Sequence, residues 1–86
     1  MPTLSMFYGI MIQMFWNEHA PPHFHARYAH YKLTVNINTL EVIAAKMPRR
    51  AQNLVLEWAL LHRDALLEDW ALCQQKQAPK KIPPLR

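Results

Sequence analysis

The spacing of apolar side chains changes near the middle of this sequence, from steps of two residues to steps of three and four. Between residues 6 and 46, apolar and polar side chains alternate in several short runs, which is typical of β-strands. Between residues 48 and 76, the apolar positions recur every three or four residues, which is typical of helices that bury one face. A chain that forms strands first and helices afterwards belongs to the α+β class.

Short strands are predicted for the first half and two helices for the second. We expect strands over residues 6–15, 23–28 and 32–37 and a short fourth strand over 41–46, with a proline-rich turn at 17–22. Pro48 suits the first turn of one helix, Asp64 is a candidate N-cap of a second, and Pro79 ends the helical region. The expected fold is therefore a small antiparallel sheet of three to four strands followed by two helices packed on one face.

Length and composition restrict the class of protein further. With 86 residues the chain has room for one domain, which we place at residues 1–76, followed by a basic, proline-rich tail over 77–86. The only glycine, Gly9, excludes glycine-rich phosphate loops, and the only cysteine, Cys73, excludes an internal disulfide. The apolar run at 4–16 is shorter than the roughly 20 residues that a bilayer requires. We expect a cytoplasmic protein that makes no use of a membrane.

Positive charge is concentrated at the end of the chain. The formal net charge is +4, and residues 76–86 contain four basic side chains and no acidic one. Such a tail attracts polyanions through counterion release, or it keeps the chain in solution and binds nothing. Ile82 and Leu85 are unusual in a solvated tail and predict that it docks on its own domain or on a partner.

Two further basic residues begin the first predicted helix. Cations at a helix N-terminus oppose the helix dipole, which favours an anionic partner near that point. The candidate nucleic-acid-binding residues are therefore Arg49, Arg50, Lys80 and Lys81.

The densest group of reactive side chains lies at residues 16–25, where three of the five histidines occur. His23 and His25 are two apart on a predicted strand, so their imidazoles point to the same face, about 6–7 Å apart at the backbone. His19 lies across the proline-stiffened turn and is able to fold back toward them.

This histidine group is compatible with a metal site, with metal-free acid–base catalysis, and with a strand face that does no chemistry. Three imidazole nitrogens, with Glu18 as a further ligand or a base, fit a metal site that keeps a position open for water. Without a metal, a histidine pair supplies a general base and a general acid, and Arg27 on the same face steadies a phosphate. The same spacing also occurs on solvated strand faces that do no chemistry. Whether the chain is an enzyme stays open; if it is, we expect metal-independent RNA cleavage with no metal and no other cofactor, and the candidate catalytic residues are His23, His25, Arg27 and His19.

Several segments of the sequence resemble a family of small bacterial proteins, domain of unknown function 4160. The segments are Met1-Pro2-Thr3, Phe7-Tyr8-Gly9-Ile10, Phe15-Trp16-Asn17-Glu18-His19, Pro21-Pro22-His23-Phe24-His25-Ala26, Val55-Leu56-Glu57-Trp58-Ala59 and Asp69-Trp70. The resemblance covers nearly the whole chain and implies no established activity. It does imply a two-gene module, since such proteins are usually encoded beside a second small protein, and a toxin–antitoxin pair is the natural interpretation.

Taken together, these observations predict a partner-binding component of a toxin–antitoxin type module. Its expected partner is the small protein encoded by the neighbouring gene, and RNA is the expected target if this chain is the toxic half. Self-association into a homo-oligomer stays open. The alternatives are a protein-interaction subunit without catalysis and a histidine-based metal-binding protein.

Overall fold

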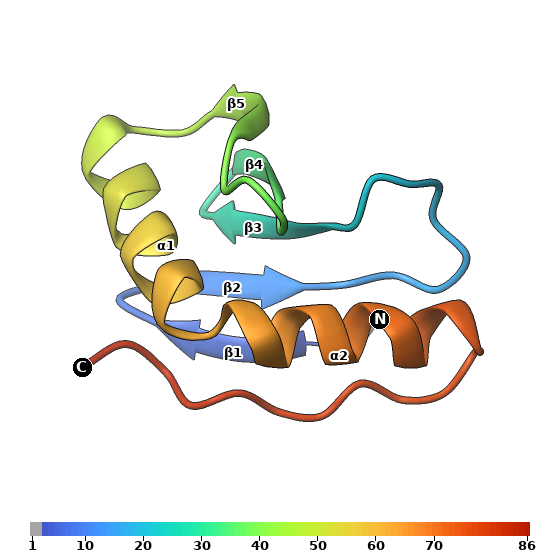
Figure 1. Cartoon of the computed structure of the whole chain (residues 1–86). Helices are drawn as coiled ribbons and strands as arrows, with labels where there is room; N and C mark the ends of the chain where they lie inside the picture. The colour runs from blue at the N-terminus through green and yellow to red at the C-terminus, as the bar shows by residue number, and fades with distance from the viewer. Residues whose placement is uncertain (1–2) are drawn as a thin grey trace.

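A computed structural model describes residues 3–86, which form one five-stranded antiparallel sheet and two helices (Figure 1). The elements, in chain order, are β1 (Thr3–Phe7), β2 (Ile10–Gln13), β3 (His23–Tyr28), β4 (Tyr31–Asn36), β5 (Val42–Lys46), α1 (Arg49–Leu61) and α2 (Arg63–Gln74). Neighbours in sequence are neighbours in the sheet, whose order is β1-β2-β3-β4-β5. The α+β class and the antiparallel sheet are confirmed. Within residues 3–86, neither helix has the length and apolar character needed to cross a bilayer.

The prediction of three to four strands is wrong, because the first predicted strand is a hairpin of two. Its turn consists of Tyr8 and Gly9, both with positive φ (50° and 78°). Two central residues with positive φ give the twist that two-residue hairpins favour. Phe7 pairs with Ile10 across this turn. The apolar alternation runs through the turn without a break, so the periodicity of the sequence did not reveal it.

One face of the sheet forms the core together with both helices. The strand residues that point to this face include Phe24, Ala26 and Leu33, which are almost completely buried. Trp58 of α1 is also fully buried, and its ring lies 5.5 Å from that of Phe7 and 5.9 Å from that of Phe24. Because strand side chains alternate between faces, the intervening residues of β3 and β4 point to the opposite face, which is called the open face below.

The C-terminal segment docks on the domain rather than extending from it. It runs back past α2 and β1 in Figure 1. The backbone N–H of Ile82 donates to the carbonyl of Leu4 (2.9 Å), and the indole N–H of Trp58 donates to the carbonyl of Pro83 (2.8 Å). The Ile82 side chain is 5% exposed and belongs to the core. The two apolar residues of this basic segment, Ile82 and Leu85, are thus accounted for by its own domain.

Candidate functional site

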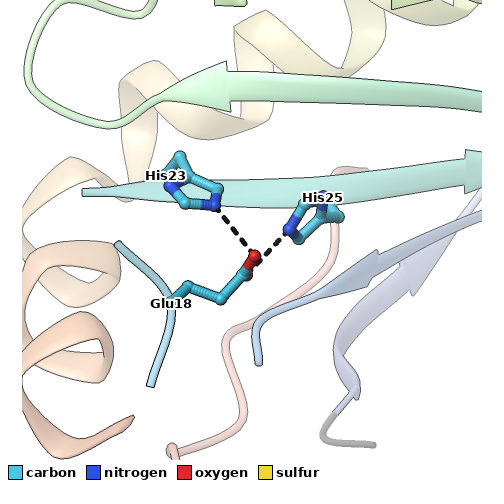
Figure 2. Close-up of side chains that lie close together, drawn as sticks. All are labelled: Glu18, His23 and His25. Atoms are coloured by element: carbon cyan, nitrogen blue, oxygen red, sulfur yellow. Dashed lines mark hydrogen bonds and ion pairs between the residues drawn. The ribbon is translucent and has the colours of Figure 1, made fainter. Parts of the chain in front are cut away.

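Two histidines of β3 and one carboxylate of the β2–β3 loop come together at a single point (Figure 2). The Nε2 atom of His23 lies 3.2 Å from Oε2 of Glu18, and Nε2 of His25 lies 2.8 Å from Oε1. One donor atom of each side chain lies within 4.8 Å of the other two. We call these three residues, Glu18, His23 and His25, the histidine–carboxylate cluster.

The sheet and the second helix each position part of this cluster. His23 and His25 share a face because they are two apart on β3, as the sequence predicted. Glu18 belongs to the long loop between β2 and β3, and its backbone carbonyl accepts a hydrogen bond from Nε2 of Gln74 at the end of α2 (3.0 Å). The loop that carries this carboxylate is therefore tied to α2 by a residue 56 positions away.

Aromatic side chains enclose the two imidazoles from both ends. The ring of Phe15 lies 4.7 Å from that of His25, and the ring of Trp70 in α2 lies 5.1 Å from that of His23. The His23, His25 and Glu18 side chains are 12%, 25% and 26% exposed. A small ion or a water molecule can reach the cluster, while the aromatic walls shield it from bulk solvent.

The hydrogen bonds of His23 determine which of its nitrogens carries the proton. Nδ1 lies 2.8 Å from the carbonyl of Pro21, and because a carbonyl only accepts, Nδ1 must donate. In the neutral ring Nε2 then has a lone pair, and this lone pair faces the ionised carboxylate of Glu18 at 3.2 Å. Two acceptors at this distance repel each other unless a cation, either a proton or a metal ion, lies between them.

His25 is able to present a lone pair at the same point. Its Nδ1 lies 3.3 Å from the hydroxyl of Thr34 on the neighbouring strand β4, and a hydroxyl both donates and accepts. When the hydroxyl accepts, the proton of His25 is on Nδ1 and its Nε2 turns a lone pair toward Glu18. All three side chains then direct lone pairs to one point, with the second nitrogen of each ring held by a protein oxygen. Histidine ligands of metal sites are held in this way.

The remaining residues predicted as catalytic lie outside the cluster. His19 is exposed, and no side-chain hydrogen bond involves it within residues 3–86. Arg27 is also exposed and occupies the open face two residues beyond His25. The structure thus brings His23 and His25 together, leaves Arg27 on the same face of the sheet, and leaves His19 apart from both.

The residues predicted to bind nucleic acid lie outside the cluster, at the start of α1 and in the C-terminal segment. Arg49 and Arg50 are exposed at the start of α1. Lys80 forms an ion pair with Glu68 (3.0 Å), and Nζ of Lys81 donates to the carbonyl of Thr3 (2.6 Å). Both lysines help to fasten the C-terminal segment to the domain.

Three residues of the site were absent from the predicted catalytic set. Glu18 is the carboxylate that joins the two histidines; the sequence predicted it only as a further ligand or a base of the metal site, not as a member of the catalytic set. Thr34 and Trp70 contact the imidazoles across the sheet and from α2. Nothing in the local sequence indicates that these two residues approach β3.

Cys73, another possible metal ligand, is buried in the core beside this region. Burial raises the pKa of its thiol, and the negative charges of Asp69 and Glu18 raise it further. A thiol that resists ionisation is a poor ligand and a poor nucleophile. The reactive groups of this region are therefore the oxygen and nitrogen atoms of the histidine–carboxylate cluster.

The chain is a small α+β protein in which two helices cover one face of a meandering sheet. Its histidine–carboxylate cluster lies at the end of the central strand β3. The sequence model of the family described as Domain of unknown function (DUF4160) matches residues 9–71. The chain belongs to this family, as the resemblance of its motifs indicated. No curated protein and no solved structure matches the chain.

Proposed function

We propose that Glu18, His23 and His25 bind a divalent transition-metal ion of the zinc class, and that the bound ion serves hydrolytic chemistry. The observation that carries this proposal is the 3.2 Å contact between His23 Nε2 and Glu18 Oε2, which are both acceptors when the ring is neutral and the carboxyl ionised. A metal ion between them turns a repulsive contact into two favourable bonds. The hydrogen bonds of His23 to Pro21 and of His25 to Thr34 support the same assignment.

The distances within the cluster suit a metal ion after small movements. Zinc binds imidazole nitrogen and carboxylate oxygen at about 2.0–2.2 Å, so two ligands in tetrahedral geometry lie about 3.3–3.5 Å apart. The distance from Glu18 to His23 is 3.2 Å, and that to His25 is 2.8 Å. Binding therefore requires the carboxylate and His25 to separate by about half an ångström, which a loop residue such as Glu18 can accommodate.

Three protein ligands leave a position open for water. Two histidines and one glutamate are the ligands of well-known hydrolytic zinc sites, in which the metal lowers the pKa of the bound water to about 7. An ion held by Glu18, His23 and His25 would supply this chemistry, namely a water activated for attack on a carbonyl or phosphoryl group. The proposed role of this chain's residues is to hold the ion, exclude bulk water through Phe15 and Trp70, and leave the open position toward solvent.

Calorimetric titration of the protein with zinc, after removal of metal by a chelator, tests the proposal. One zinc ion per chain is expected, with binding lost in the His23→Ala and His25→Ala variants and weakened in Glu18→Gln. His30→Ala is the matched control, because His30 is exposed and lies in the β3–β4 turn. Equal zinc binding by the wild type and by the His23→Ala/His25→Ala double variant would overturn the assignment.

A metal-free function is the second candidate, and the same contact favours it. A proton on Nε2 of His23 also relieves the repulsion with Glu18, and it would make His23 a general acid. Arg27 on the same face then supplies the cation for a phosphate, which is the RNA cleavage expected from the sequence. Incubation of the protein with labelled RNA, with and without EDTA, separates the two candidates. Cleavage that survives the chelator supports the metal-free function and contradicts the hydrolytic role of the ion.

We further propose that the chain is the partner-associated component of a two-gene module of toxin–antitoxin type. Family membership and the exposed apolar side chains of the β1–β2 hairpin, Met6 and Tyr8, support this proposal; these side chains are 60% and 59% exposed. Expression of the chain alone and together with its neighbouring gene, with growth as the readout, tests it. Growth arrest that the neighbour relieves is expected, and identical growth in both cases would contradict the proposal.

A further inference from the structure

The open face of the sheet carries three basic residues in one row across adjacent strands. In the register of the sheet, Arg27 of β3 lies directly opposite Lys32 of β4, and Lys32 lies directly opposite Lys46 of β5. All three side chains are exposed. Because neighbouring strands are about 4.8 Å apart, the row places three positive charges within about 10 Å at the backbone.

No carboxylate of the described chain neutralises this row. The three ion pairs within residues 3–86 involve Glu18, which pairs twice, and Glu68, and none of them includes a residue of the row. Four of the six acidic residues belong to the helices, and a fifth, Glu41, lies in the β4–β5 connection. Like charges directly opposite each other destabilise a sheet. An arrangement that repeats them across three strands is therefore better matched to an anionic ligand than to the stability of the fold.

The row lies along a groove that leads to the histidine–carboxylate cluster. One hollow of about 400 Å³ is bordered by Phe15, His25 and Arg27, and a second of about 570 Å³ is bordered by His30 and Lys46. Both hollows share Lys32 and Thr34. His25, which borders the first hollow, is also a member of the cluster. An extended anionic polymer in this groove would thus run past the three cations and reach the proposed metal site.

Aromatic side chains at the cluster end of the groove indicate what kind of polymer fits. Phe15 lines the first hollow, and Trp16 beside it is 50% exposed. Proteins that bind single-stranded nucleic acid combine a positively charged groove with aromatic rings on which unpaired bases stack. A duplex offers no unpaired base to such rings, and an acidic peptide offers no planar base at all.

We propose that the open face binds the phosphate backbone of a single-stranded polynucleotide through Arg27, Lys32 and Lys46, with a base stacked on Phe15 or Trp16. This inference deepens the proposed function, because it names the polymer whose phosphodiester would reach the metal centre. It also extends the phosphate contact that the sequence predicted for Arg27 to Lys32 and Lys46, whereas the residues predicted to bind nucleic acid lie at α1 and in the C-terminal segment.

Fluorescence anisotropy with a labelled 12-nucleotide oligouridylate, measured over a range of salt concentrations, tests the inference. We expect the Lys32→Gln/Lys46→Gln variant to weaken binding about tenfold and to reduce the slope of log affinity against log salt by about 1.4. The matched control is Lys76→Gln/Arg86→Gln, which removes the same charge from two exposed residues of the C-terminal segment. This control should change the affinity less than threefold. A third variant, Arg49→Gln/Arg50→Gln, tests whether the N-terminus of α1 contributes to oligonucleotide affinity.

Several outcomes would overturn the inference. One is the absence of oligouridylate binding at low salt. Another is an equal loss of affinity in Lys32→Gln/Lys46→Gln and in its control Lys76→Gln/Arg86→Gln. The third is a loss of affinity in Arg49→Gln/Arg50→Gln that exceeds the loss in Lys32→Gln/Lys46→Gln. Equal displacement of the oligonucleotide by polyglutamate of the same length would point instead to an acidic protein partner. The titrations are run in EDTA and repeated with His23→Ala. Oligonucleotide binding that persists under both conditions supports the open face as the binding surface, even if the calorimetric titration detects no zinc binding. The two proposals are therefore judged separately.

Discussion

Nε2 of His23 and Oε2 of Glu18 lie 3.2 Å apart, although both atoms are acceptors when the ring is neutral and the carboxyl ionised. The cause is the hydrogen bond on the other side of the ring, where Nδ1 must donate to the carbonyl of Pro21. The proline-rich loop thus fixes the tautomer of His23 and aims its lone pair at Glu18. The pair is stable only with a positive charge between its members, and this requirement underlies the proposed metal site.

The hydroxyl of Thr34 is expected to hold His25 in the tautomer that binds metal. Removing it in Thr34→Val leaves Nδ1 of His25 without its partner on β4. Loss of such a partner typically weakens metal binding about 10–100-fold, so we expect zinc affinity to fall by about tenfold or more. Thr34→Ser, which keeps the hydroxyl, should bind zinc like the wild type. Equal affinity in Thr34→Val and Thr34→Ser would show that the hydroxyl does not orient the ring.

Gly9 is expected to be required by the β1–β2 turn. Its φ is +78°, and an added Cβ would lie 3.4 Å from the ring of Tyr28. A side chain in this conformation costs about 1–2 kcal/mol, so Gly9→Ala should lower the free energy of unfolding by about that amount. Gly9→Asn should lower it less, because asparagine tolerates positive φ. Urea denaturation monitored by circular dichroism measures the difference, and a Gly9→Ala variant as stable as the wild type would refute this account of the turn.

The C-terminal segment is expected to contribute to stability through Ile82. This side chain is 5% exposed in the core, and truncating a buried isoleucine to alanine costs about 2–5 kcal/mol. We expect Ile82→Ala to lie at the lower end of that range, because the segment is at the end of the chain and can relax. Pro84→Ala, at an exposed position in the same segment, should leave the urea midpoint almost unchanged. Equal midpoints for Ile82→Ala and the wild type would mean that the segment does not dock in solution.

Asp69 is expected to make stability depend on pH. Burial raises the pKa of its carboxyl above the usual value, and the hydrogen bond from the backbone N–H of Lys80 opposes that effect only in part. A carboxyl with a raised pKa in the folded state favours folding while it is protonated, and this contribution is lost as pH rises through the folded pKa. Asparagine does not titrate and keeps an oxygen for Lys80. The stability of Asp69→Asn relative to the wild type should therefore increase between pH 4 and pH 7 in urea denaturation, and a difference independent of pH would contradict the assignment.

Periodicity was sufficient to predict the elements whose burial alternates regularly. β3 and β4 begin and end within one residue of their predicted bounds, because Phe24, Ala26, Leu33 and Val35 alternate with polar residues. The β1–β2 hairpin was not predicted, because its turn, Tyr8-Gly9, continues the apolar pattern of the two strands. Turn geometry at those positions depends on backbone φ values, which leave no trace in hydrophobicity.

Local spacing also predicted the pairing of His23 and His25. It offered Glu18 as a ligand or base of a metal site, but not the contacts of its carboxylate with both rings. Two residues on one strand face are a consequence of the β conformation alone. The position of the Glu18 carboxylate depends instead on a long loop held by Gln74, far away in sequence. The row formed by Arg27, Lys32 and Lys46 depends in the same way on strand register, which single-sequence patterns do not specify.

The X-ray absorption spectrum of the zinc-loaded protein at the zinc edge tests the central claim most directly. The account predicts two imidazole nitrogens at about 2.0–2.1 Å and one or two further oxygen ligands at about 2.0–2.2 Å. His23→Ala should remove one imidazole from the spectrum, whereas His30→Ala should leave it unchanged. A shell of sulfur at about 2.3 Å, or a zinc ion surrounded only by oxygen, would contradict the histidine–carboxylate centre.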